Sequence, residues 1–178
     1  GSQLTTNETQ ISATASSGLP VTFTLISGPA SLSGSSSPAS LTYTNSGTVV
    51  IRASQAGNTN WYEAPAVTQT FTVAKTPQDA LDFTPTTPQT VATTNALTTT
   101  GGSGTGTVSY AVESGAGQIV NSTNLTMLKG TGTVTVVATK ASDDIYLSTA
   151  TTATVSCAKA NQTITFNALS DTFWTNRP

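Results

Sequence analysis

Residues 130–142 read GTGTVTVVATKAS, and this stretch decides the fold class. Val134, Val136 and Ala138 lie two residues apart, so in an extended strand they share one face, with Thr135 on the other. Thr and Val side chains branch at Cβ, which costs rotamer freedom in a helix and suits a pleated sheet. The stretch therefore predicts a β-strand with one buried face.

This stretch belongs to a long internal repeat. Matching stretches, in the same order along the chain, are TASSGLPVTFTLISG (14–28) with TTGGSGTGTVSYAVESG (99–115), GTVVIRASQAG (47–57) with 130–142, and FTVAK (71–75) with VSCAK (155–159). Tyr62 in NTNWYEAP aligns with Tyr146 in DDIYLSTA. The spacing of about 85 residues exceeds the 20–50 residues of solenoid repeats, so the repeating unit is a domain.

Within each copy, short apolar runs are separated by Gly, Ser and Asn turns. In the second copy we expect strands at DALDF (79–83), VATTNALTTT (91–100), TVSYAVES (107–114), QIVN (118–121), NLTML (124–128), GTVTVVATK (132–140) and TATVSCAK (152–159). Short strands at this density fit a Greek-key β-sandwich. We therefore predict an all-β chain with two tandem sandwiches, repeat 1 over residues 3–75 and repeat 2 over residues 76–159.

The first residues of the chain correspond to a point inside the repeating unit and not to its beginning. Repeat 2 opens with PQDALDF (77–83), but Gln3 corresponds to Gln89, which lies beyond that opening. We therefore expect repeat 1 to lack its opening strand. Such a gap leaves a groove in the core and an unpaired sheet edge.

The C-terminal residues carry a further copy of the opening strand. NQTITF (161–166) resembles the opening of repeat 2, with Phe166 in the place of Phe83. We expect residues 160–178 to begin a third repeat with this extra C-terminal strand, whose apolar face carries Ile164 and Phe166. We predict that the strand completes repeat 1 of another molecule by strand exchange.

Composition and charge exclude several classes of protein. Charged residues make up 8% of the chain, against roughly 25% in an average globular protein. The net charge is −2 and the six cations are scattered, whereas phosphate binding needs clustered Lys and Arg. We therefore exclude nucleic acid as a partner. Because no apolar run approaches the roughly 20 residues that span a bilayer, we expect no membrane insertion of this stretch.

The side chains needed for catalysis are scarce. The sequence contains no histidine, which rules out a Ser-His-Asp triad, a Cys-His pair and a His-ligated metal. Asp143 and Asp144 are adjacent rather than spaced as in a calcium loop, so we interpret them as a solvated turn. Cys157 lies within an apolar strand, where a free thiol behaves as a small core residue. We expect no catalytic residue, no cofactor and no metal site.

Three stretches carry a family resemblance. ISATASSGLPVTFTLISGPASLSG (11–34), GTVVIRASQAGNTNWYEAPAVTQTFTVAK (47–75) and AKANQTITFNALSD (158–171) resemble the bacterial immunoglobulin-like repeats of large surface and secreted proteins. The resemblance covers essentially the whole chain, with repeat 2 as a sister variant of repeat 1. It implies an extracellular or cell-surface sandwich that acts as a spacer or an adhesive module and has no active site.

Aromatic residues precede the last strand of each repeat. Because a tyrosine recurs there, as Tyr62 and Tyr146, we interpret it as packing over the end of its sandwich with the hydroxyl in water. The alternative is that Trp61, Tyr62 and Trp174 are ligand contacts that stack on a sugar.

The leading functional hypothesis is a non-catalytic structural repeat, with a spacer or adhesive role outside the cell. Its expected partners are neighbouring repeats of the same protein and further copies that exchange strands. The alternatives are an adhesin module that binds a glycan or a host or cell-surface protein through loop aromatics, and an accessory domain of a secreted hydrolase.

Overall fold

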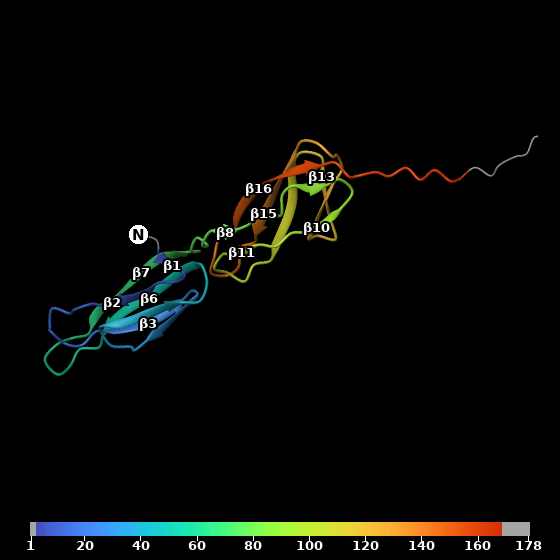
Figure 1. Cartoon of the computed structure of the whole chain (residues 1–178). Coiled ribbons are helices and arrows are strands. Elements are labelled where there is room, and N and C mark those ends of the chain that lie inside the picture. Colours follow the sequence, from blue (N-terminus) through green and yellow to red (C-terminus); the bar gives the residue numbers. More distant parts are fainter. Residues whose placement is uncertain (1–2, 169–178) are drawn as a thin grey trace, which may run out of the picture.

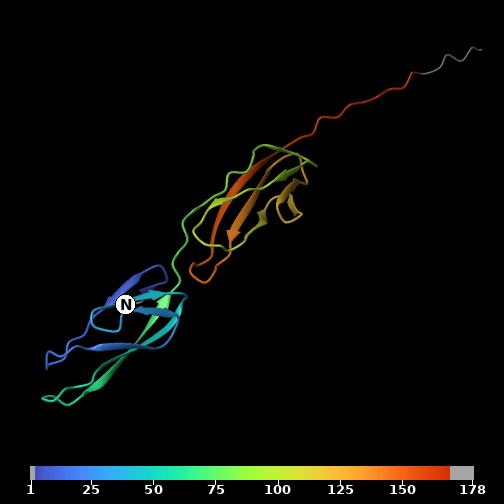
Figure 2. The ribbon, with the colours of Figure 1, turned by 90° about the horizontal axis from the view of Figure 1, so that it is seen from below.

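The computed structural model describes residues 3–168, and within that range every regular element is a β-strand. The strands form two immunoglobulin-like β-sandwiches that lie end to end (Figures 1 and 2). The all-β prediction is confirmed.

Repeat 1 packs a four-stranded sheet, in the order β1-β7-β6-β3, on a three-stranded sheet, in the order β2-β5-β4. Its strands are β1 (Gln3–Leu4), β2 (Glu8–Ile11), β3 (Thr22–Ser27), β4 (Ala30–Ser33), β5 (Ala39–Tyr43), β6 (Gly47–Gln55) and β7 (Ala64–Ala74). The short β1 pairs in parallel with the end of β7, and all other neighbours are antiparallel.

Repeat 2 repeats this topology with sheets β12-β15-β16-β9 and β10-β14-β13. The strands are β9 (Gln89–Thr90), β10 (Thr94–Ala96), β12 (Val108–Ser114), β13 (Gly117–Val120), β14 (Asn124–Met127), β15 (Thr133–Lys140) and β16 (Thr149–Ala158). It also has an additional antiparallel pair, β8 (Leu81–Asp82) with β11 (Thr100–Gly101). Among the described residues repeat 1 has no such pair.

Each sandwich has its own hydrophobic core. Alternate residues of β6 and β15 point inward, and Val49, Val134 and Val136 are fully buried. Leu41 and Leu125 occupy corresponding positions on the facing sheets. Two separate clusters of this kind mean that each repeat buries its apolar surface against itself.

Residues 160–168 follow β16 and run away from both sandwiches (Figure 1). They are exposed and form no strand in the single chain, because no other strand lies beside them to supply backbone partners. The strand predicted at residues 161–166 is therefore not formed within this molecule.

Candidate functional site

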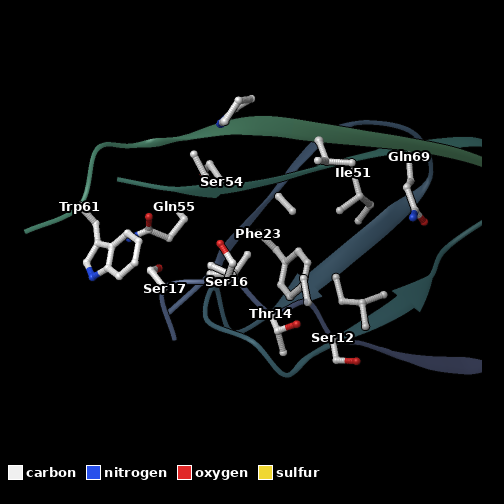
Figure 3. Close-up of a pocket in the computed structure, with 18 of the residues that line it drawn as sticks. Ser12, Thr14, Ser16, Ser17, Phe23, Ile51, Ser54, Gln55, Trp61 and Gln69 are labelled. Carbon is white, nitrogen blue, oxygen red and sulfur yellow. The ribbon is translucent and has the colours of Figure 1, made fainter. Parts of the chain in front are cut away.

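Repeat 1 has an open groove of about 830 Å³ along the side where its two sheets part. Phe23 lies at the centre of the groove and Ile51 toward one end, while Trp61 lies at the other end (Figure 3). The chain that follows β2, residues 12–17, forms one wall. An apolar floor with hydroxyl and backbone groups at its edge suits an extended peptide or a flat apolar ligand.

The groove exposes residues whose counterparts in repeat 2 are covered. β7 pairs with β6 in repeat 1 as β16 pairs with β15 in repeat 2. In this pairing Phe71 holds the position of Val155, and Gln69 holds the position of Ala153. Val155 is fully buried and Ala153 half-buried, whereas Phe71 is only half-buried and Gln69 is exposed. The inner face of β7 is therefore left open where the inner face of β16 is not.

The facing sheet shows the same difference. Register places Ile11 at the position of Leu97 in repeat 2. Leu97 belongs to the buried core of repeat 2, whereas Ile11 is half-buried and lines the groove. On both sheets that line the groove of repeat 1, residues at core positions are therefore left uncovered.

The loop at the groove end alters the expected pairing of aromatic residues. Asn58 Oδ1 accepts hydrogen bonds from the backbone N–H groups of Asn60 and Trp61, at 2.8 and 3.0 Å. Asp143 Oδ1 accepts the same pair of bonds from Ile145 and Tyr146, at 3.0 and 2.7 Å. The counterpart of Tyr146 is therefore Trp61 and not Tyr62. The alignment was wrong by one residue because the difference in loop length falls after the aromatic residue.

The predicted packing role of Tyr62 is also wrong. Its side chain is 99% exposed, and that of Trp61 is 53% exposed at the mouth of the groove. Tyr146 is half-buried because its loop lies against the linker from repeat 1. Among the described residues the Trp61 loop has no such neighbour, and the side chains of Trp61 and Tyr62 are exposed.

The second candidate is the joint between the repeats, which sequence reasoning did not find. Thr76 pairs in parallel with Tyr146: its N–H donates to the Ile145 carbonyl at 2.8 Å, and its carbonyl accepts from Leu147 N–H at 2.9 Å. Thr5 Oγ1 also donates to the Ile145 carbonyl, at 2.6 Å. Lys75 Nζ donates to the Asp143 carbonyl. The joint therefore combines the backbone pairing of Thr76 with side-chain hydrogen bonds to backbone carbonyls of repeat 2.

Asp143 organises the repeat 2 loop that forms this joint. Hydrogen bonds from the backbone N–H groups of Tyr146, Thr105 and Ile145 and from the Thr105 hydroxyl lower the pKa of its carboxyl group from 3.8 to about 2. The carboxylate thus ties two loops of repeat 2 together. The prediction of a solvated turn missed this role.

The other predicted site residues fall in different places. Ile164 and Phe166 lie on the extended C-terminal segment and are 95% and 80% exposed. Trp174 lies outside the described residues. Within residues 3–168, no three His, Cys, Asp or Glu side chains are placed to hold a metal ion. Cys157 is half-buried with its Sγ 3.8 Å from Met127 Sδ.

No helix within residues 3–168 has both the length and the apolar character needed to cross a membrane. No family model matches the chain, and no curated protein matches it.

Solved structures that resemble the chain do so at low sequence identity. The structure of mouse cadherin-23 EC22-24 is 17% identical, with a TM-score of 0.36 over 79% of this chain and 54% of that chain. The C-terminal 282-residue fragment of intimin, in complex with the intimin-binding domain of the translocated intimin receptor, is 17% identical, with a TM-score of 0.32 over 85% and 57%. This chain spans little more than half the length of either structure, and the likeness concerns the fold alone.

Proposed function

We propose that the chain is a non-catalytic structural segment of a large bacterial cell-surface or secreted protein, in which the two repeats act as a spacer. The observation that carries this proposal is the joint on the loop around Tyr146: Thr76 of the linker pairs with this loop, and Thr5 and Lys75 of repeat 1 donate hydrogen bonds to its carbonyls. The placement outside the cell and the bacterial source rest on the sequence resemblance. The histidine-free sequence supports the non-catalytic assignment.

A spacer must keep its units in line, and the joint is built for that. Thr76 uses both its N–H and its carbonyl group toward repeat 2, so the linker cannot swivel about this residue without losing both bonds. Gln78 adds two bonds from its side-chain amide to the carbonyls of Ala141 and Leu147, at 3.1 and 2.7 Å. Thr76 and Gln78 thus fix the linker at more than one point to residues 141–147 of repeat 2.

NMR relaxation of backbone ¹⁵N nuclei tests the spacer role. We expect the two repeats of the native chain to tumble as one elongated body, with a shared rotational diffusion tensor. Thr76→Pro removes the N–H that donates to Ile145 and should let the repeats tumble separately. Thr76→Ala keeps that N–H and is the matched control. Separate tumbling of the native repeats in dilute solution would contradict the proposal.

The exposed Trp61 favours an adhesive role as the second candidate function. A half-exposed indole at the mouth of an apolar groove can stack on the face of a sugar. A glycan array probed with the native chain and with Trp61→Ala tests this role. Binding that the substitution abolishes supports it, and the absence of binding on the array rejects glycans as the ligand.

A further inference from the structure

Repeat 2 shows how a sandwich of this type is closed. Its opening strand, β8, pairs with β11 through Asp82 with Thr100 and Leu81 with Gly101. This pairing lays Phe83 into the core, where it is 6% exposed and contacts the ring of Tyr110. β8 is thus the cover of the groove side of repeat 2.

The groove of repeat 1 occupies the position that β8 covers in repeat 2. Register places Phe23 at the position of Tyr110. Counting three residues on from Ile11 and from Leu97 places Thr14 at the position of Thr100. Thr14 and Phe23 line the open groove, as does Phe71 on the opposite wall. The same molecule therefore displays one covered groove and one uncovered groove of the same design.

The C-terminal segment has the side chains of a cover. Phe166 follows Ile164 by two residues, as Phe83 follows Leu81, so both pairs share one face of an extended strand. Leu81 is half-buried and Phe83 buried, whereas both tail residues are exposed to solvent. Ile164 and Phe166 are thus two large apolar side chains on an unpaired segment, and they suit the apolar sides of the groove in repeat 1.

The C-terminal segment does not lie over the groove of its own chain. The segment leaves repeat 2 at the end away from repeat 1 and runs outward along the line of the two repeats (Figures 1 and 2). The linker that delivers β8 follows Lys75 at the end of repeat 1, and the segment follows Lys159 at the matching end of repeat 2. A second copy placed beyond repeat 2 would receive the segment as repeat 2 receives β8.

We propose that residues 161–168 of one copy add to repeat 1 of a second copy as its opening strand. Phe166 packs on Phe23 of the second copy, as Phe83 packs on Tyr110, and the backbone of Thr165 pairs with that of Thr14. The contact joins unlike surfaces head to tail, so successive copies form open chains or closed rings. The inference does not rest on the spacer role.

One local difference decides the register of this pairing. Gly101 has a φ of 81°, and a Cβ built on it would lie 2.5 Å from the Ala80 carbonyl oxygen. Ala15 stands at the corresponding position of repeat 1, so a strand cannot approach that residue as closely. We therefore assign the backbone pairing in repeat 1 to Thr14.

Light scattering of the full chain tests the proposal. We expect the mass to rise from the monomer value of 18.0 kDa as concentration increases. The double variant Ile164→Ser, Phe166→Ser should stay monomeric, whereas Thr163→Ser, which changes the other face of the segment, should associate as the native chain does. These side chains are exposed, so the variants fold. A native chain that is monomeric at millimolar concentration, or a double variant that associates normally, overturns the proposal.

A peptide of residues 160–168 locates the acceptor. In a chain with Trp174→Phe, Trp61 is the one remaining tryptophan and reports on the groove. We expect the peptide to shift Trp61 emission to shorter wavelength and to return associated chains to single copies, and we expect no effect from a peptide with serine in place of Phe166. Association that leaves Trp61 emission unchanged would place the segment elsewhere and overturn the proposal.

Discussion

Phe83 packs on Tyr110, with the ring centroids 5.5 Å apart and the ring planes inclined by 40°. Phe83 comes from the opening strand and Tyr110 from the sheet, so this contact closes the sandwich of repeat 2. In repeat 1, Phe23 holds the place of Tyr110, and no ring from its own repeat holds the place of Phe83 within the described residues. The two repeats differ most at this one contact.

Phe83→Ala should therefore destabilise repeat 2 strongly. Truncating a buried phenylalanine costs about 3–5 kcal/mol through lost burial and the cavity that remains. Urea unfolding followed by NMR signals from the core of repeat 2 measures the change. Phe166→Ala is the control, because Phe166 is exposed in the single chain and its truncation should leave repeat 2 unchanged in dilute solution. Equal losses from the two substitutions would contradict the account.

Tyr43→Phe should stabilise repeat 1. The Tyr43 hydroxyl is buried and finds no hydrogen-bond partner among the described residues, while its ring packs edge-on against Phe71 at 6.1 Å. A buried hydroxyl without a partner costs about 1–3 kcal/mol, and phenylalanine keeps the ring contact without that cost. Thermal unfolding measures the gain as a rise in the Tm of repeat 1. A fall in Tm would show that the hydroxyl has a partner.

Acid should loosen the loop that forms the joint. Because the pKa of Asp143 is lowered to about 2 from an unfolded value of 3.8, its stabilising effect is full above pH 3.8 and is lost as the pH falls toward 2. We expect the protection factors of the Thr105, Ile145 and Tyr146 amides, taken relative to the intrinsic exchange rate at each pH, to fall over that interval. Asp143→Ala should show the low protection already at neutral pH. An Asp143 carboxyl that titrates near 3.8 in the folded chain would contradict this prediction.

The strands and their inward faces could be predicted from the sequence because the signal is local. The alternation of apolar and polar residues in 132–140 predicts β15, and the apolar face of DALDF predicts β8. The predicted strand at 91–100 is broken into β10 and the first residue of β11, because the chain changes partners there: β10 pairs with β14 and β11 pairs with β8. Sequence alternation does not reveal which sheet a strand joins.

The groove could be predicted and the joint could not, for a physical reason. A missing opening strand is visible as a gap in the repeat, and its consequence for the core follows from topology. The joint depends on backbone groups of Thr76 and Ile145, which carry no side-chain signature in the sequence. The role of Asp143 was missed for the same reason, since its partners are backbone N–H groups of distant residues such as Thr105.

The central claim is that repeat 1 is completed by an added opening strand. Attaching that strand to repeat 1 within one chain tests this claim most directly. In repeat 2, residues 84–88 connect Phe83 to Gln89, so a graft of NQTITF followed by TPTTP can replace residues 1–2 and lead directly into Gln3. A matched graft with serine in place of the phenylalanine is the control.

Unfolding of repeat 1 in the grafted chain, followed by Trp61 fluorescence in the Trp174→Phe background, gives the answer. The account predicts that the phenylalanine graft stabilises repeat 1 by about 3 kcal/mol or more relative to the serine graft, the scale of one buried phenylalanine, and that the chain no longer associates. Equal stability of the two grafts, with the groove still open to the 160–168 peptide, would contradict it.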